Sequence, residues 1–449
     1  MEVPQTRYAR SGELSIAYQI VGDGPFDLVL VPPLFSNVEL AWEFPPRAHL
    51  NTELAKFSRL VIFDKRGTGL SDRVDRLPNL EERVDDVRAV LDTIGSSRAA
   101  LLSIHDGASM ACLAAASHPD RIFALVLCEP YARTLWAPDY PWGASVQDAE
   151  AAVHRSQTSW GSLEYTDAVL DFLLEGAKAS EELRQSMARF HRGSASPKSA
   201  AEILRVYYET DVRAVLPSIQ VPTLVVYRHS QTVEHARYVA EHIAGARLEE
   251  LPGQGAALFG DDLTAAALAI VRTFLDGAVQ GNRVVESDRV LATVLFTDLV
   301  DSTTKAVELG DARWRELVVA HHARVRQELV KHRGRELDTA GDGFFASFDG
   351  PARAIRCACA IRDSVGELGL DVRAGLHTGE CEQLDGKVGG VAVITGARVA
   401  AKAAANEVLV TATVRELVAG SGISFEDRGV HALKGLPEER QLYAVVATE

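Results

Sequence analysis

Residues 290–303 read VLATVLFTDLVDST, an apolar and β-branched run that leads into two aspartates and a Ser-Thr pair. The run predicts a buried strand, and Ser302 and Thr303 predict the start of a helix. Asp298 is therefore expected at the end of a strand, beside helix-start amides that suit a phosphate oxygen.

A second acidic motif, AGDGF, occupies residues 340–344 between two short β-type segments. Its Gly-Asp-Gly predicts the tight turn of a β-hairpin. Alone, this tripeptide is usually no more than a turn. Together with Asp298 on a neighbouring strand, however, Asp342 forms a pair of hard oxygen ligands. Mg²⁺ and Mn²⁺ take such pairs when water and substrate phosphate supply the other ligands.

Five segments in the last third of the chain resemble the catalytic domain of class III adenylate and guanylate cyclases. They are LFTD (295–298), TAGDG (339–343), RAGLHTGE (373–380), GARVA (396–400) and LKG (433–435). The resemblance implies a βαββαβ ferredoxin-like core and a head-to-tail homodimer with active sites at the subunit interface. The implied reaction is attack of a ribose 3′-hydroxyl on the α-phosphate of a nucleoside triphosphate, which releases pyrophosphate.

The same resemblance implies roles for particular residues. Two Mg²⁺ or Mn²⁺ ions per site are expected on Asp298, Asp342 and the backbone of Leu299, and Ser302 and Thr303 are expected near the nucleotide. Arg398 matches the arginine that stabilises transition-state charge, a task that suits a planar guanidinium. Arg373 and His377 are expected to be structural.

Three positions depart from the adenylate cyclase pattern. Asp338 replaces the usual base-contacting lysine, and Lys387 replaces the base-reading aspartate if the segment at Gly389-Gly390 has no gap. Ile394 replaces an asparagine and cannot donate a hydrogen bond. The exchanged pair suits guanine, whose N1-H and N2-H₂ are donors and whose O6 is an acceptor, but it also suits adenine in a rotated pose. Fused cyclases of actinobacteria often lack the usual specifying residues and are regarded as adenylate cyclases, so ATP is preferred and GTP is the alternative.

The first 280 residues follow a βαβ pattern, which predicts a mostly parallel sheet covered on both faces. Apolar strands are expected at residues 28–31, 60–63, 100–102 and 124–127. The segments DKRGTGLSD (64–72) and HPDR (118–121) resemble the α/β-hydrolase fold over about residues 20–275, with a helical cap near 135–215. The fold class is therefore α/β in the N-terminal part and α+β, ferredoxin-like, in the C-terminal part.

A hydrolase of this fold needs a nucleophile in G-x-S-x-G, followed by an acid and a histidine. The corresponding elbow is SIHDG (103–107), which places His105 at the nucleophile position. No carboxylate follows the strand at 221–227, and residues 254–257, QGAA, stand where the final histidine is expected. The sequence thus predicts an inactive hydrolase domain that regulates the cyclase or stabilises its dimer, and whose cleft binds a small apolar or ester-like ligand.

Length and composition set the remaining limits. The 449 residues, 47% of them hydrophobic, are expected to form two domains, 1–280 and 289–449, with a boundary at 276–283. A net charge of -15 argues against nucleic-acid binding. The sequence contains neither a run of about 18 apolar residues nor a secretory signal pattern, so no membrane insertion and a cytoplasmic location are expected. The spacing of the five cysteines indicates neither a disulfide framework nor a zinc site.

Three functional interpretations follow. The first is a homodimeric, metal-dependent nucleotidyl cyclase with a regulatory pseudo-hydrolase domain. The second is a catalytically silent dimer that binds a nucleotide or another ligand. The third is an esterase acting through His105 or Asp106.

Overall fold

The computed structural model describes residues 3–228, 232–251, 255–256, 261–281, 289–384 and 387–448. The chain divides into two compact units, residues 1–287 and 288–449, and each is described by itself. None of the helices within the described ranges is both long and apolar enough to cross a bilayer.

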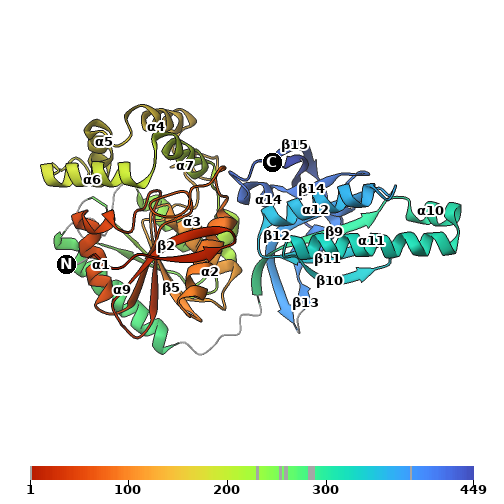
Figure 1. Ribbon diagram of the computed structural model, residues 1–449, viewed down its shortest axis with the longest axis horizontal. Coiled ribbons are helices and arrows are strands. Elements are labelled where there is room, and N and C mark those ends of the chain that lie inside the picture. Colours follow the sequence, from red (N-terminus) through yellow and green to blue (C-terminus); the bar gives the residue numbers. More distant parts are fainter. Residues whose placement is uncertain are drawn as a thin grey trace. The chain divides into compact units, whose positions relative to one another are not determined.

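The first unit, coloured from red to green in Figure 1, contains a sheet of eight strands. Their order is β1-β2-β4-β3-β5-β6-β7-β8. Strands β1 and β2 pair antiparallel and β2 pairs antiparallel with β4, whereas the strands from β4 to β8 are parallel. The strands are β1 Arg7–Ser11, β2 Leu14–Val21, β3 Asp27–Val31, β4 Arg59–Phe63, β5 Ala99–Ile104, β6 Ile122–Cys128, β7 Thr223–Tyr227 and β8 Arg247–Glu250. The strands expected from the apolar runs are β3, β4, β5 and β6, and each is present and buried.

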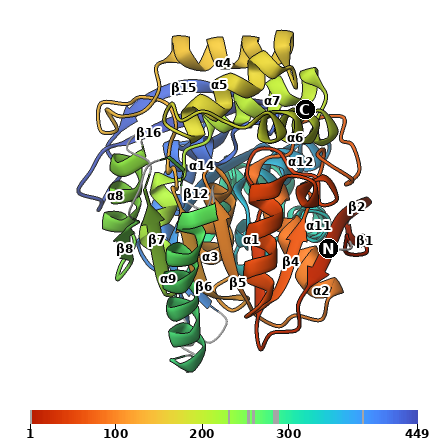
Figure 2. The same cartoon turned by 90° about the vertical axis from the view of Figure 1, so that its left-hand side faces the viewer.

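Helices cover both faces of this sheet. Helices α1 (Pro45–Ala55) and α9 (Asp261–Gln280) lie side by side on one face, where Leu50 and Val271 join the core (Figure 2). Helix α3 (Gly107–Ser117) contacts β3, β5 and β6, and α2 packs against it. The other helices of this part are α2 Leu80–Thr93 and α8 Val233–His242, with 3₁₀ turns η1 Leu40–Trp42 and η2 Arg213–Ser218.

A helical cap is inserted between β6 and β7. Its helices are α4 Val146–Ser159, α5 Leu163–Leu173, α6 Glu181–Ser194 and α7 Pro197–Glu209. Serines cap all four helices, because the hydroxyl oxygens of Ser145, Ser162, Ser180 and Ser196 accept backbone hydrogen bonds from the first turns. Trp160 and other apolar residues of the cap pack in one cluster with Phe35, which precedes the cap in the chain.

The second unit contains a sheet with the order β10-β11-β9-β12-β14-β16-β15, and β13 pairs with β12. The strands are β9 Arg289–Leu299, β10 Arg335–Ala340, β11 Gly343–Phe348, β12 Val372–Leu384, β13 Lys387–Gly389, β14 Val408–Thr411, β15 Ile423–His431 and β16 Arg440–Thr448. The helices are α10 Ser302–Leu309, α11 Asp311–Lys331, α12 Pro351–Gly366, α13 Val391–Ala400 and α14 Ala412–Leu417. The elements β9-α11-β10-β11-α12-β12 form the expected βαββαβ core, with antiparallel pairing throughout.

The two faces of this sheet differ in what covers them. Helices α11 and α12 pack on the face that carries Leu295, Leu299 and Phe344, and together they form the main core of the unit. Helix α13 packs on the opposite face, against Val294. All five cysteines of the chain are buried and free.

Candidate functional site

Two acidic positions meet at the same end of adjacent strands. Asp298 is the penultimate residue of β9, and the two-residue turn between β10 and β11 consists of Gly341 and Asp342. The β9–β11 register pairs Phe344 with Thr297, so Gly343 lies opposite Asp298. Asp342 is the residue immediately before Gly343. A Cβ atom on Gly343 would lie 3.8 Å from Asp298 Oδ1, so the carboxylate of Asp298 rests over this turn.

The carboxylate of Asp342 has an oxygen without a donor. Its Oδ2 is buried and accepts no hydrogen bond from any residue that the structure describes. The turn itself is held by α11, since His321 Nε2 donates to Asp342 O and His322 Nε2 donates to Gly341 O, each at 3.0 Å. Burial lowers the pKa of His321, which favours the neutral ring. A buried carboxylate oxygen without a donor is costly, and a cation at this turn would satisfy it.

Asp298 is already engaged by a positive charge. The Nη2 and Nε atoms of Arg373 both donate to Asp298 Oδ2, the second at 3.1 Å. The contact follows from the antiparallel register of β9 and β12, which places these two residues directly opposite each other. Arg373, expected from the sequence to be structural, therefore orients a candidate metal ligand and leaves Oδ1 towards Gly343.

Next to the carboxylates, the sheet face carries an aromatic pair that is only half-buried. The rings of Phe296 and Phe345 stack with centroids 4.5 Å apart and planes 4° apart. Strand pairing places Asp338 opposite Phe345 on the edge strand β10, where its side chain is exposed and Oδ1 accepts from Thr339 N at 2.9 Å. Asp338, the ring pair and Asp298 therefore share one face of the sheet.

Helix α13 presents a separate exposed stripe. Val391, Ile394 and Arg398 recur at helical spacing, and the first two are 63% and 48% exposed. Arg398 Nε donates to Lys434 O at 3.1 Å. Among the described residues, no hydrogen bond or ion pair joins Arg398 to Asp298 or Asp342 within one chain.

Of the remaining predicted cyclase residues, Leu299, Ser302 and Thr303 lie at this end of β9. Ser302 and Thr303 begin α10 after Asp301, whose φ is 56°, and Leu299 is buried.

Lys387 begins β13, but its side chain lies outside the part of the chain that the structure describes. Strand β13 pairs with residues 382–384 of β12 and so lies at the opposite end of β9, where Glu382 pairs with Arg289. Within one chain the strand pairing therefore does not bring Lys387 next to Asp338, contrary to the prediction of a base-reading pair.

In the first unit, His105 occupies the sharp turn between β5 and α3 with φ 51°. Its Nε2 atom lies 3.6 Å from Oε2 of Glu129, a fully buried residue that directly follows β6 and also has a positive φ. Glu129 follows β6, whereas the acid was expected from the sequence only after β7, so the sequence did not predict this residue. Arg228 follows β7 and donates to Gly255 O and Ala256 O. The sequence predicted that the acid and histidine positions of the triad are empty. Residues 229–231, 254 and 257, which belong to those positions, lie outside the described residues.

A cavity of about 620 Å³ opens at this turn, between the sheet and the cap. Its lining is mainly aromatic and apolar and includes His105, Tyr131, Trp142, Phe190, Tyr207 and His235. Asp106 does not offer a free carboxylate there, because its Oδ1 accepts from Leu34 N at 2.8 Å and its Oδ2 lies 3.9 Å from Lys65 Nζ. Ser103 is fully buried in β5.

Comparisons with known proteins match both units to families. Residues 28–262 match the alpha/beta hydrolase fold family, and residues 285–447 match the adenylate and guanylate cyclase catalytic domain. "Putative adenylate cyclase 3" of Rhizobium meliloti is 28% identical over 158 residues, which cover 33% of this chain and 27% of that protein. "Probable esterase D14L" of rice, Oryza sativa subsp. japonica, is 24% identical over 248 residues, covering 53% of this chain and 87% of that protein.

Among solved structures, a bromoperoxidase from Bacillus anthracis aligns with a TM-score of 0.52 and 17% sequence identity. The alignment covers 61% of this chain and 100% of the bromoperoxidase chain. At this level of identity the likeness shows the fold alone. The chain spans only about half or less of the length of the first curated relatives it matches. The two family matches nevertheless cover nearly the whole chain in succession. The chain belongs to the alpha/beta hydrolase fold family through residues 28–262 and carries, in residues 285–447, a class III adenylate and guanylate cyclase catalytic domain.

Proposed function

We propose that the C-terminal domain converts ATP to cyclic AMP and pyrophosphate, at a site that two copies of the chain complete together. The observation that supports this most directly is the donor-free Oδ2 of Asp342 beside Asp298 at the end of two adjacent strands. Two carboxylates with an unsatisfied oxygen fit a divalent cation, Mg²⁺ or Mn²⁺.

Asp298 and Asp342, with the backbone of Leu299, are the residues that would hold two such ions. When bound, the ions lower the pKa of an attacking hydroxyl and neutralise phosphate charge. The amides that open α10 at Ser302 and Thr303 bind and orient phosphate oxygens. Arg373 keeps Asp298 in place, with Oδ1 towards the turn.

The position of Arg398 supports a head-to-tail dimer. Arg398 stabilises charge that develops on the α-phosphate, yet in one chain it makes no contact with the carboxylates among the described residues. It shares its exposed stripe with Val391 and Ile394, apolar side chains that a second copy would cover. The stacked Phe296–Phe345 pair offers a further half-buried apolar surface on the carboxylate face.

Asp338 is the proposed contact for the nucleobase. Asp338 is exposed on the same face as the ring pair, where it can accept from a base. An acceptor at this position suits the N1-H and N2-H₂ donors of guanine, so GTP is the alternative substrate, although Lys387 does not lie beside Asp338 within one chain. ATP stays first because fused cyclases with atypical base-contacting residues are regarded as adenylate cyclases.

The test uses the purified full-length chain with Mn²⁺ and either ATP or GTP, with cyclic product measured by chromatography. We expect cyclic product from the wild type, at least a hundredfold less from Asp342→Asn, and no change in Asp363→Asn, whose carboxylate is 67% exposed on α12. Absence of product from the wild type with both nucleotides refutes the cyclase. A higher rate with GTP than with ATP would show that the domain is a guanylate cyclase and not an adenylate cyclase.

A catalytically silent nucleotide-binding dimer is the second candidate. Two observations favour it: Arg373 already neutralises Asp298, and Ile394 stands on α13 where a donor is expected. This candidate predicts nucleotide binding by calorimetry without cyclic product.

The N-terminal domain is proposed to regulate the cyclase through a small apolar ligand in the 620 Å³ cavity. A thermal-shift screen of apolar and ester-like compounds, followed by cyclase assays with each hit, tests this. Bound ligands that never change turnover refute it. The His105–Glu129 pair also makes weak esterase activity testable: hydrolysis of short p-nitrophenyl esters that disappears in His105→Ala supports it, and hydrolysis that persists rejects it.

A further inference from the structure

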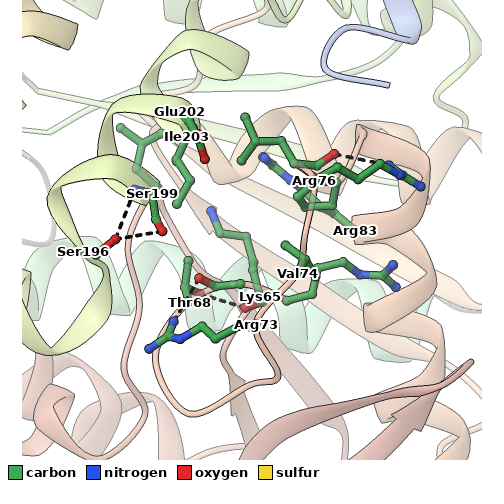
Figure 3. A pocket seen from close by; sticks show the side chains of 15 residues that line it. Lys65, Thr68, Arg73, Val74, Arg76, Arg83, Ser196, Ser199, Glu202 and Ile203 are labelled. Carbon is green, nitrogen blue, oxygen red and sulfur yellow. Dashed lines mark hydrogen bonds between the residues drawn. The ribbon is translucent and has the colours of Figure 1, made fainter. Parts of the chain in front are cut away.

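A second cavity of the N-terminal unit, about 340 Å³, has a cationic lining that neither proposed activity uses. It lies between the segment that follows β4 and the start of α7 (Figure 3). The cationic lining residues are Lys65, Arg66, Arg73, Arg76 and Arg83, and the acidic one is Glu202. In a chain with a net charge of -15, such a concentration of positive charge needs an explanation.

Two of these cations are buried. The side chain of Lys65 is 4% exposed, and Arg83 is 8% exposed. Lys65 Nζ donates to Pro33 O at 2.6 Å, and its nearest carboxylate oxygen, Asp106 Oδ2, is 3.9 Å away. Burial lowers the pKa of Lys65 to about 8 and also lowers that of Arg83.

Arg83 is the more unusual of the two. In the described part of the chain, its guanidinium makes no hydrogen bond and no ion pair within 4.0 Å, although Asp86 and Asp106 attract it over longer range. A buried charge without a close partner is costly, and native proteins rarely keep one. Arg83 is one of the residues that line this cavity.

The other cations of the lining are committed to partners. Arg66 forms an ion pair with Asp86, and Arg76 pairs with Glu82. Arg73 donates to the carbonyl oxygens of Gly67 and Gly69. These contacts hold the cationic wall in shape. Lys65 has Asp106 as an ion-pair partner at 3.9 Å, so Arg83 is the cation of the lining for which the described residues supply no close carboxylate.

The facing wall is the N-terminal turn of α7. Ser196 and Ser199 lie there with hydroxyl oxygens 3.0 Å apart, and Figure 3 shows them across the cavity from Lys65. A helix of 13 residues brings the positive end of its dipole to this point. Hydroxyl donors and a helix start therefore face two buried cations.

The rest of the lining is apolar and includes Leu34, Leu77 and Ile203. The cavity thus has a polar region suited to an anion and an apolar region suited to an organic group. A carboxylate offers two oxygens to these donors, whereas a phosphoryl group offers three, which accept together from the guanidinium, ammonium and hydroxyl groups.

We propose that this cavity binds a small phosphate monoester, with its phosphoryl group on Lys65, Arg83 and the α7 serines and its organic group against Leu34, Leu77 and Ile203. This ligand is separate from the nucleotide of the cyclase and from the apolar ligand of the larger cavity, because it occupies its own site in the N-terminal unit.

Isothermal titration calorimetry on the full-length chain without nucleotide tests the proposal. The probes are phenyl phosphate, inorganic phosphate and benzoate, at matched ionic strength. We expect saturable binding of phenyl phosphate, about tenfold weaker binding of inorganic phosphate because burial of the ring is lost, and no saturable heat with benzoate.

Variants locate the site. Arg83→Gln is expected to weaken phenyl phosphate binding at least tenfold, and Ser199→Ala about threefold. Arg205→Gln, an exposed arginine later on the same helix, is the matched control and should bind as the wild type does. Ser199→Ala leaves the buried cations in place, so it keeps the test valid if Arg83→Gln does not fold. Absence of saturable binding by phosphate probes, benzoate binding equal to that of phenyl phosphate, or equal affinity in the Ser199 and Arg205 variants overturns the proposal.

Discussion

Replacement of Asp342 by asparagine should separate the stability of the cyclase domain from its response to metal. In the metal-free protein the buried Oδ2 accepts no hydrogen bond from a described residue, so its charge costs stability. Leaving such a group unsatisfied costs about 1 to 3 kcal/mol. We therefore expect metal-free Asp342→Asn to be as stable as the wild type or about 1 kcal/mol more stable, a conservative value because the residue is only partly buried.

With Mn²⁺ the order should reverse. A ligand at a hundred times its dissociation constant stabilises the folded state by about 2.7 kcal/mol. For a domain of roughly 150 residues, each kcal/mol shifts the midpoint by about 2 to 4 °C, so saturating Mn²⁺ should raise the midpoint of the wild-type domain by about 5 to 11 °C. Asp342→Asn, which lacks one of the two carboxylates, should show a far smaller rise.

Differential scanning calorimetry of the full-length chain, with and without Mn²⁺, measures both effects. Asp363→Asn serves as the control for loss of an exposed carboxylate in the same domain. An equal Mn²⁺ shift in wild type and Asp342→Asn would show that the ion binds elsewhere. A metal-free Asp342→Asn several kcal/mol less stable than the wild type would show that Oδ2 has a stabilising partner.

Three further predictions concern other parts of the chain. Gly375→Ala should lower the free energy of unfolding of the cyclase domain by about 1 to 3 kcal/mol, measured by chemical denaturation, because a Cβ atom at this position would lie 2.0 Å from Ala400 N. A decrease below about 0.5 kcal/mol would contradict the close packing of α13 on β12. Burial lowers the pKa of His191 to about 4, whereas the unfolded state keeps the ordinary value of 6.5. Between these values the unfolded state binds more protons than the folded state. The stability that the neutral His191 ring contributes is therefore present above pH 6.5 and is lost as the pH falls. From pH 8 to 5 this costs about 2 kcal/mol, which His191→Phe should avoid in pH-dependent urea unfolding. Equal losses in both proteins would refute the assignment. Asp338→Lys should raise the ratio of ATP to GTP turnover if Asp338 contacts the base, and an unchanged ratio would show that it does not.

The apolar runs were sufficient to predict individual strands, whereas the two architectures were predicted from the resemblance to known families. Strands β3 to β6 and β9 lie where those runs occur, and the Gly341-Asp342 turn forms the hairpin that its glycines predict. The predicted boundary at 276–283 differs in one respect: α9 continues to Gln280, where the sequence suggested a polar connection. The reason is tertiary packing, since Ala278 still contacts the core of the first unit.

The candidate sites were only partly predictable, because their remaining members depend on strand register and burial. Arg373 reaches Asp298 through the pairing of β12 with β9, which no local pattern in the sequence specifies. Glu129 reaches His105 from the end of a neighbouring parallel strand, 24 residues later in the chain. Lys65 and Arg83 resemble solvent-exposed charges in sequence, and only the fold shows that both are buried beside a cavity.

The glycine contacts of α13 have a mechanical consequence. Gly396 lets the helix approach Val294 of β9, and Gly375 of β12 lets the backbone of Ala400 come close, so α13 is fixed to the two strands that bear Asp298 and Arg373. In the proposed twofold dimer, each sheet therefore supplies carboxylates to one reaction centre while its attached helix supplies the arginine to the other. A displacement of either sheet must then alter both centres at once, which would make turnover at one depend on the loading of its twin.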